Sequence, residues 1–123
     1  INTLNKDISN YQSAQVKEVK KIRTNTLNNV LKDLKIEIQI DFMNIDVEGF
    51  EEKVLFGFDI QKYKPLVVSV EFLDLEMKKL EFKNNNIQRI LDSNIYKYFI
   101  NNNSFFVNWL HGDLIFVHKD LRD

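Results

Sequence analysis

The chain has 123 residues and a formal net charge of −1, so it lacks the overall field that attracts nucleic acid or anionic lipid, and we expect no nucleic-acid partner. Its hydrophobic content of 44% and charged content of 28% are typical of one globular core. The lack of cysteine excludes a disulfide framework, a Cys-ligated metal centre and a thiol nucleophile, and it indicates a reducing, cytoplasmic location.

The amino-terminal part is mostly polar and then gives one clear helical pattern. Residues 1–15 follow neither a helical nor a strand period, and we interpret them as a loosely ordered lead-in to a single partial domain spanning residues 1–123. The Lys-rich segment Val16–Ile22 fits either a short edge strand or a helical turn. An amphipathic helix is expected next, because Thr26 is a suitable N-cap for apolar residues at helical spacing: Leu27, Val30, Leu31 and Leu34.

A strand–helix–strand unit follows. Ile38–Val47 is rich in β-formers and ends at Glu48 and Gly49, so it predicts a strand. Glu51 and Glu52 then suit the first turn of a short helix that ends near Gly57. Pro65–Phe72 is apolar on both parities, which is typical of a central parallel strand covered by helices on both faces. The crossover between the two strands is expected to be right-handed.

The carboxyl-terminal part predicts one more helix and two strands. Leu75–Phe82 reads as a charged connector, and Asn84 to Asn86 offer N-caps for a helix that Asn94 would end in a left-handed conformation. Tyr96–Ile100 and Leu114–His118 are predicted strands. The connection between them, which includes the Phe105–Leu110 stretch, is too short for a helical crossover, so this last pair is expected to be antiparallel.

Three carboxylates are the best candidates for chemistry. Asp46 and Glu48 follow the first strong strand, and Glu71 lies near the end of the second. Ligands of open α/β sheets bind beyond the carboxyl ends of parallel strands, so these side chains are expected on one edge. There they could hold a divalent cation or act as a general base toward a substrate hydroxyl. Helix capping or pairing with lysine is the competing structural interpretation.

Other chemistry-bearing residues are interpreted as structural. His111 and His118 lack metal-ligand spacing, and no metal site is assigned. Phe105, Phe106 and Trp109 are interpreted as core residues, and the basic run Lys17, Lys20, Lys21 and Arg23 as a solvated face. No glycine-rich phosphate loop occurs, and the longest nearly apolar run is far below the roughly 20 residues of a membrane helix. The start at Ile1, without a signal-peptide pattern, reads as a fragment of a longer chain.

The segment I-D-F-M-N-I-D-V-E-G-F-E-E-K-V-L-F-G-F, residues 40–58, resembles the most recognisable motif of the FkbM family of S-adenosylmethionine-dependent methyltransferases. The resemblance continues through K-P-L-V-V-S-V-E and the closing G-D-L-I-F-V-H-K-D, so it runs from about residue 19 to residue 119. Two departures stand out: Asn44 replaces the family's usual lysine, and Asn94 its usual glycine. The matching motif residues are Asp41, Phe42, Ile45, Asp46, Val47, Glu48, Gly49, Glu51, Val54, Leu55 and Gly57.

The resemblance implies the carboxyl-terminal half of a class I (Rossmann-like) methyltransferase sheet, mostly parallel, with strand order first, second, fourth, third and an antiparallel last strand. It also implies S-adenosylmethionine as cofactor and a hydroxyl of a sugar, glycolipid or polyketide as methyl acceptor. The family's glycine-rich turn and the strands around it do not occur in these 123 residues, so this piece alone is expected to be inactive. The cofactor-binding residues are not assigned.

Within this framework Asp46 is the best candidate for the methyl-transfer site, as base or metal ligand, with Glu48 and Glu71 in support. Glu51 is expected to cap its own helix. The rival interpretations are a non-catalytic α/β assembly module and a metal-dependent nuclease. The nuclease is weakened because such sites commonly have Lys two residues after the second acid, and that position is Leu73.

The strand Ile38–Val47 would be interior in the complete fold. In this chain it is predicted to have one unpaired edge, with no proline or lysine in its centre to discourage contact with another strand. We therefore expect this edge to be covered by a second copy of the chain, by the chain's own amino-terminal residues or by aggregation. Self-association through the edge is the favoured alternative.

Overall fold

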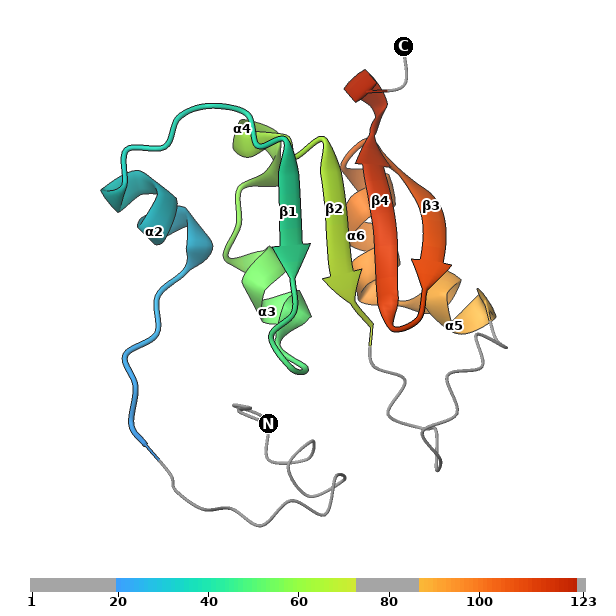
Figure 1. Cartoon of the computed structure of the whole chain (residues 1–123), viewed down its shortest axis with the longest axis horizontal. Helices are drawn as coiled ribbons and strands as arrows, with labels where there is room; N and C mark the ends of the chain where they lie inside the picture. Colours follow the sequence, from blue (N-terminus) through green and yellow to red (C-terminus); the bar gives the residue numbers. More distant parts are fainter. Residues whose placement is uncertain (1–19, 73–86, 122–123) are drawn as a thin grey trace.

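The computed structural model of the chain describes residues 20–72 and 87–121. They form a four-stranded sheet in the order β1-β2-β4-β3 (Figure 1). The strands are β1 (Phe42–Ile45), β2 (Val67–Glu71), β3 (Ser104–Leu110) and β4 (Asp113–His118). The sheet has the predicted order of first, second, fourth and third strand, but its third strand is Ser104–Leu110 instead of the predicted Tyr96–Ile100. The antiparallel last strand is confirmed. The expectation of a mostly parallel sheet is wrong for these strands, because β1–β2 is parallel whereas β2–β4 and β3–β4 are antiparallel.

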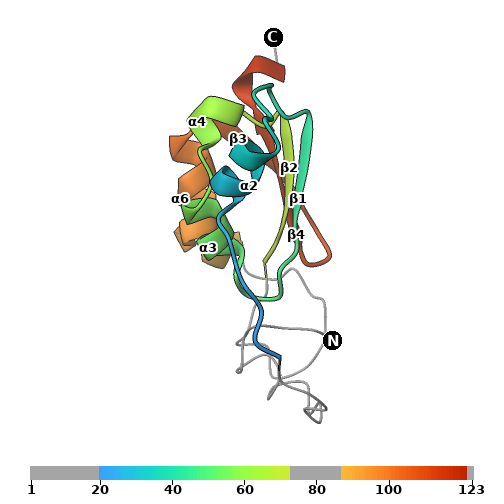
Figure 2. The ribbon, with the colours of Figure 1, turned by 90° about the vertical axis from the view of Figure 1, so that its left-hand side faces the viewer.

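The described helices lie on one face of the sheet. Figure 2 shows α2, α3, α4 and α6 on the same side of the strands. The prediction of helices on both faces of the second strand is therefore not met by the described residues. The helices are α2 (Leu27–Asp33), α3 (Glu51–Phe56), α4 (Ile60–Tyr63), α5 (Ile87–Asp92) and α6 (Asn94–Asn101), and a 3₁₀ turn, Lys119–Leu121, follows β4.

The core lies between the sheet and this helical layer. Alternate residues of each strand point toward the helices, as the two-residue period of a strand requires. The side chains of Phe99 in α6 and Phe116 in β4 are fully buried, and their rings stack with centroids 4.4 Å apart. The other buried hydrophobic residues are Met43, Ile45, Leu55, Phe58, Ile60, Tyr63, Val68, Val70, Ile90, Ile95 and Leu114.

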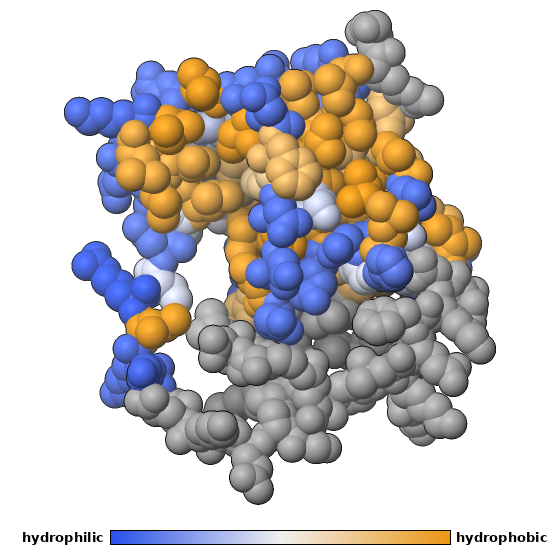
Figure 3. Space-filling model, in the orientation of Figure 1, coloured by the Kyte–Doolittle hydropathy of each residue, from blue (hydrophilic) through white to orange (hydrophobic). Residues whose placement is uncertain are grey.

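The opposite face of the sheet carries an apolar row that crosses all four strands. The strand register aligns Phe42 with Val67, Val67 with Val117, and Val117 with Phe105. The outer two side chains are the most accessible, with Phe42 61% and Phe105 43% exposed. Figure 3 views this face and shows hydrophobic residues gathered over its upper part.

The two amino-terminal helices begin and end as predicted. Thr26 caps α2 by accepting a hydrogen bond from the Asn29 N–H at 3.3 Å, and α3 ends at Gly57. The two helices are tied together because the Asn28 N–H donates to the Gly57 carbonyl at 3.0 Å. A regular strand occupies only residues 42–45 of the predicted Ile38–Val47, although Ile40 is already hydrogen-bonded to the backbone of Tyr63 and Leu66.

The predicted strand Tyr96–Ile100 is wrong, because these residues belong to helix α6. Asn94 is also not a C-cap: it is the first residue of α6, and Ser93 caps that helix by accepting from the Tyr96 N–H at 3.1 Å. The third strand is Ser104–Leu110, within the stretch interpreted as a connection. The lead-in over residues 1–15, the connector Leu75–Phe82 and the Asn84–Asn86 caps lie outside the described residues. Residues 20–22 form neither helix nor strand.

Candidate active site at the carboxyl ends of β1 and β2

The structure brings the three predicted site residues to one edge of the sheet. Asp46 directly follows β1, Glu48 lies two residues later, and Glu71 is the last residue of β2. Since β1 and β2 are parallel, their carboxyl ends meet at the same edge (Figure 1). Asp46 is exposed, whereas Glu48 and Glu71 are half-buried. The charges of Asp46 and Glu48 both act on the Glu71 carboxyl group.

The loop between β1 and α3 turns through a left-handed conformation. Glu48 has a φ of 54° and Gly49 a φ of 90°. Glycine adopts such an angle without a steric penalty, but glutamate does not. The loop is held by Glu51, whose Oε1 accepts hydrogen bonds from the Val47 N–H at 3.1 Å and the Gly49 N–H at 3.0 Å. The turn thereby fixes the direction in which the chain leaves β1.

The expectation for Glu51 is only partly right. It lies in the first turn of α3 as predicted, but its carboxylate binds the loop before the helix rather than the helix's own amides. Its side chain is also buried, with the residue only 5% exposed. Glu51 belongs to the motif quoted above, yet the motif gives no indication of this contact. Glu51 is therefore a fourth member of what we call the acidic cluster, together with Asp46, Glu48 and Glu71.

Glu71 has the most perturbed carboxyl group of the acidic cluster. Burial raises the pKa of Glu71 from 4.5 to about 7, with further contributions from the charges of Asp46, Glu51 and Glu48 and from a hydrogen bond with the Glu51 side chain. Its Oε2 is buried and has no hydrogen-bond donor among the described residues. A carboxyl group with a pKa near 7 exchanges protons readily at neutral pH, as a general acid or base must.

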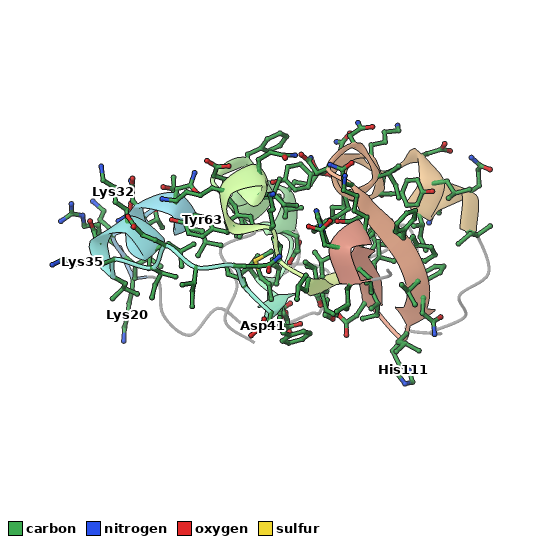
Figure 4. All side chains as sticks on the ribbon, turned by 90° about the horizontal axis from the view of Figure 1, so that it is seen from above. Lys20, Lys32, Lys35, Asp41, Tyr63 and His111 are labelled. Atoms are coloured by element: carbon green, nitrogen blue, oxygen red, sulfur yellow. The ribbon has the colours of Figure 1, made fainter. Side chains whose placement is uncertain are left out.

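The histidine and aromatic candidates lie in the β3–β4 hairpin. His111 lies in the β3–β4 turn, where the carbonyl of the next residue, Gly112, accepts from the Phe72 N–H at 2.7 Å, so this turn adjoins the end of β2. Figure 4 shows His111 far from Lys20, Lys32 and Lys35 at the α2 side. His118 is buried at the end of β4, where its Nδ1 accepts from the Asp120 N–H at 3.3 Å. Phe106 and Trp109 pack against the core as expected, but Phe105 is exposed, so its assignment to the core is wrong.

Residues 20–72 and 87–121 contain no three His, Cys, Asp or Glu side chains that are placed to share a metal ion. The helices in these ranges are all too short or too polar to cross a bilayer.

Comparison with known proteins gives one finding. The family model described as the methyltransferase FkbM domain matches residues 2–106, which include β1, β2 and the whole acidic cluster. No curated protein and no solved structure is significantly similar to the chain. The family match confirms the resemblance drawn from the motif at residues 40–58.

Proposed function

Because the chain belongs to the FkbM methyltransferase domain family, we propose that it is part of an O-methyltransferase that uses S-adenosylmethionine and acts on a hydroxyl of a sugar, glycolipid or polyketide. The observation that supports this most is the convergence of Asp46, Glu48 and Glu71 beyond the ends of two neighbouring parallel strands. Ligands of open α/β sheets bind at this kind of edge.

The acidic cluster suits both the methyl donor and the methyl acceptor of the proposed reaction. S-adenosylmethionine would supply an electrophilic methyl group on a cationic sulfonium, which a group of carboxylates attracts. The methyl–sulfur bond would break as the acceptor oxygen took the methyl group, the thioether would leave, and the hydroxyl would lose its proton. Asp46 is exposed at the end of β1 and is the proposed base that receives this proton. Glu48 and Glu71 would orient the methyl acceptor through hydrogen bonds with its hydroxyl groups.

The test is a methyl-transfer assay on the natural full-length protein, with isotope-labelled cofactor and a panel of sugar, glycolipid and polyketide acceptors. Asp46→Asn keeps the shape of the side chain but removes the base, so turnover is expected to fall about 100-fold or more. Cofactor affinity should change little, because the base acts mainly in the transition state.

Asp33→Asn is the matched control, since Asp33 is an exposed aspartate at the end of α2. Its turnover is expected to equal that of the parent. Unchanged turnover in Asp46→Asn would show that Asp46 is structural. A full-length protein that methylates no hydroxyl acceptor would contradict the proposed function.

A further inference from the structure

Glu51 differs from the other three acidic side chains because it is buried and directed at the backbone. A buried carboxylate is unfavourable unless hydrogen bonds replace its water. Glu51 Oε1 accepts hydrogen bonds from the Val47 N–H at 3.1 Å and the Gly49 N–H at 3.0 Å. These two N–H groups lie on either side of Glu48. They therefore stabilise the left-handed turn at Glu48, where the φ of 54° is disfavoured for a residue with a side chain.

The Glu51 carboxylate also acts on Glu71, at the end of β2. Its charge and a side-chain hydrogen bond both raise the pKa of the Glu71 carboxyl group. The charges of Asp46 and Glu48, from the β1–α3 loop, raise this pKa as well. The register partner of Glu71 in β4 is a further acidic residue, Asp113.

We propose that Glu51 is the positioning residue of this site: its one buried carboxylate holds the loop that presents Asp46 and Glu48. The importance of Glu51 for catalysis rests on the proposed function, whereas its hydrogen bonds to the loop do not. At this site Asp46 would accept the proton of the reacting hydroxyl, and Glu71 would donate a hydrogen bond to another oxygen of the methyl acceptor.

The experiment compares Glu51→Gln, Glu51→Ala and the control Glu52→Gln in the chain. Glu52 is the next residue of the same helical turn, but its Oε2 accepts from Asn94 Nδ2 at 3.1 Å instead of from the loop. Two quantities are measured by nuclear magnetic resonance: the hydrogen exchange of the Val47 and Gly49 amides, and the pKa of the Glu71 carboxyl group. Neither measurement depends on methyl transfer.

In Glu51→Ala, exchange of both amides is expected to accelerate about tenfold or more, because a charge-assisted acceptor is lost. In Glu51→Gln, the amide oxygen should keep both amides protected, while the pKa of Glu71 falls because a neighbouring negative charge is gone. Glu52→Gln should change neither quantity.

Slow exchange of both amides in Glu51→Ala, or an unchanged Glu71 pKa in Glu51→Gln, would overturn the proposal. If the alanine variant does not fold, the pKa of Glu71 in Glu51→Gln is the deciding measurement. If the expected shifts occur but the full-length protein transfers no methyl group, the proposed function fails and the positioning role of Glu51 stands.

Discussion

Glu71 links the protonation of the site to the stability of the fold. Its pKa is about 7 in the folded chain against an ordinary value of 4.5, mainly because of burial and then because of Asp46, Glu51 and Glu48. Between these two pH values the folded state holds a proton that the unfolded state has released. The contribution of this group to stability is therefore complete below pH 4.5 and is lost as the pH rises through about 7.

Replacing Glu71 by Gln is expected to remove this pH dependence, because the amide is neutral at every pH. The free energy of unfolding of the parent should fall relative to that of Glu71→Gln by about 1 kcal/mol between pH 5 and pH 8, a value reduced for solvent screening of a half-buried group. Urea unfolding at the two pH values measures this difference. Glu37→Gln, at an exposed position, is the control and should follow the parent. A parallel pH response in parent and Glu71→Gln would contradict the expectation.

The sequence allowed three of the four acidic residues to be placed at the carboxyl ends of β1 and β2, because a general rule on parallel strands was sufficient. Asp46, Glu48 and Glu71 follow or end strands, and the ends of neighbouring parallel strands share an edge. Glu51 was expected to cap its own helix, and its contact with the loop was not predicted, since that contact depends on a left-handed Glu48. Glutamate rarely adopts that conformation, so no local pattern predicts it.

At the scale of elements, helix prediction was reliable where the cap residue and the helical period agreed. Thr26 and the apolar spacing after it predicted α2 correctly. In Tyr96–Ile100 the aromatic and β-branched residues favoured a strand, but Ser93 is a cap and Ile95 and Phe99 are buried one helical turn apart. The tertiary contact of Tyr98 adds to the helix, because its hydroxyl lies 3.2 Å from the carbonyl oxygens of Leu55 and Phe58. That contact is not visible in the sequence.

The junction of α2 and α3 is expected to be sensitive to the size of residue 57. A Cβ atom at Gly57 would lie 3.2 Å from Cβ and 3.3 Å from Cγ2 of Thr26, the cap of α2. We expect Gly57→Ala to lower the free energy of unfolding by about 1 kcal/mol, because the two helices must separate slightly. Chemical denaturation provides the measurement.

Gly112→Ala is the matched control for this substitution. Nothing lies within 4 Å of a Cβ atom built at Gly112, in the β3–β4 turn, so the variant should be close to the parent in stability. Equal stability of Gly57→Ala and Gly112→Ala would show that the α2–α3 junction adapts to the added methyl group at no measurable cost.

At the scale of the whole molecule, β1 is an edge strand of the sheet that residues 20–72 and 87–121 form, as the sequence predicted for Ile38–Val47. An edge strand presents unpaired backbone groups to other chains. Phe42 adds an exposed aromatic ring to the same strand, with 61% of the residue accessible. We propose that the chain associates with itself through this edge, and sedimentation velocity over a range of concentrations is expected to show a concentration-dependent increase in mass.

Phe42→Lys is expected to reduce this association, since a charged side chain discourages contact between edges. Phe56→Lys is the control, because Phe56 is 78% exposed but belongs to helix α3, in the helical layer, instead of to strand β1. A parent chain that stays monomeric at high concentration, with rapidly exchanging amides in Phe42–Ile45, would refute self-pairing.

The apolar row on the open face of the sheet has a calorimetric consequence. Phe42 and Phe105, at its two ends, keep much of their surface in water in the folded chain. Apolar surface that is hydrated before and after unfolding adds nothing to the heat-capacity change of unfolding. The stability curve of the monomer should accordingly be flatter than its number of aromatic residues suggests. Any association that covers this row should show a negative heat-capacity change of binding and a binding enthalpy that becomes more favourable on warming.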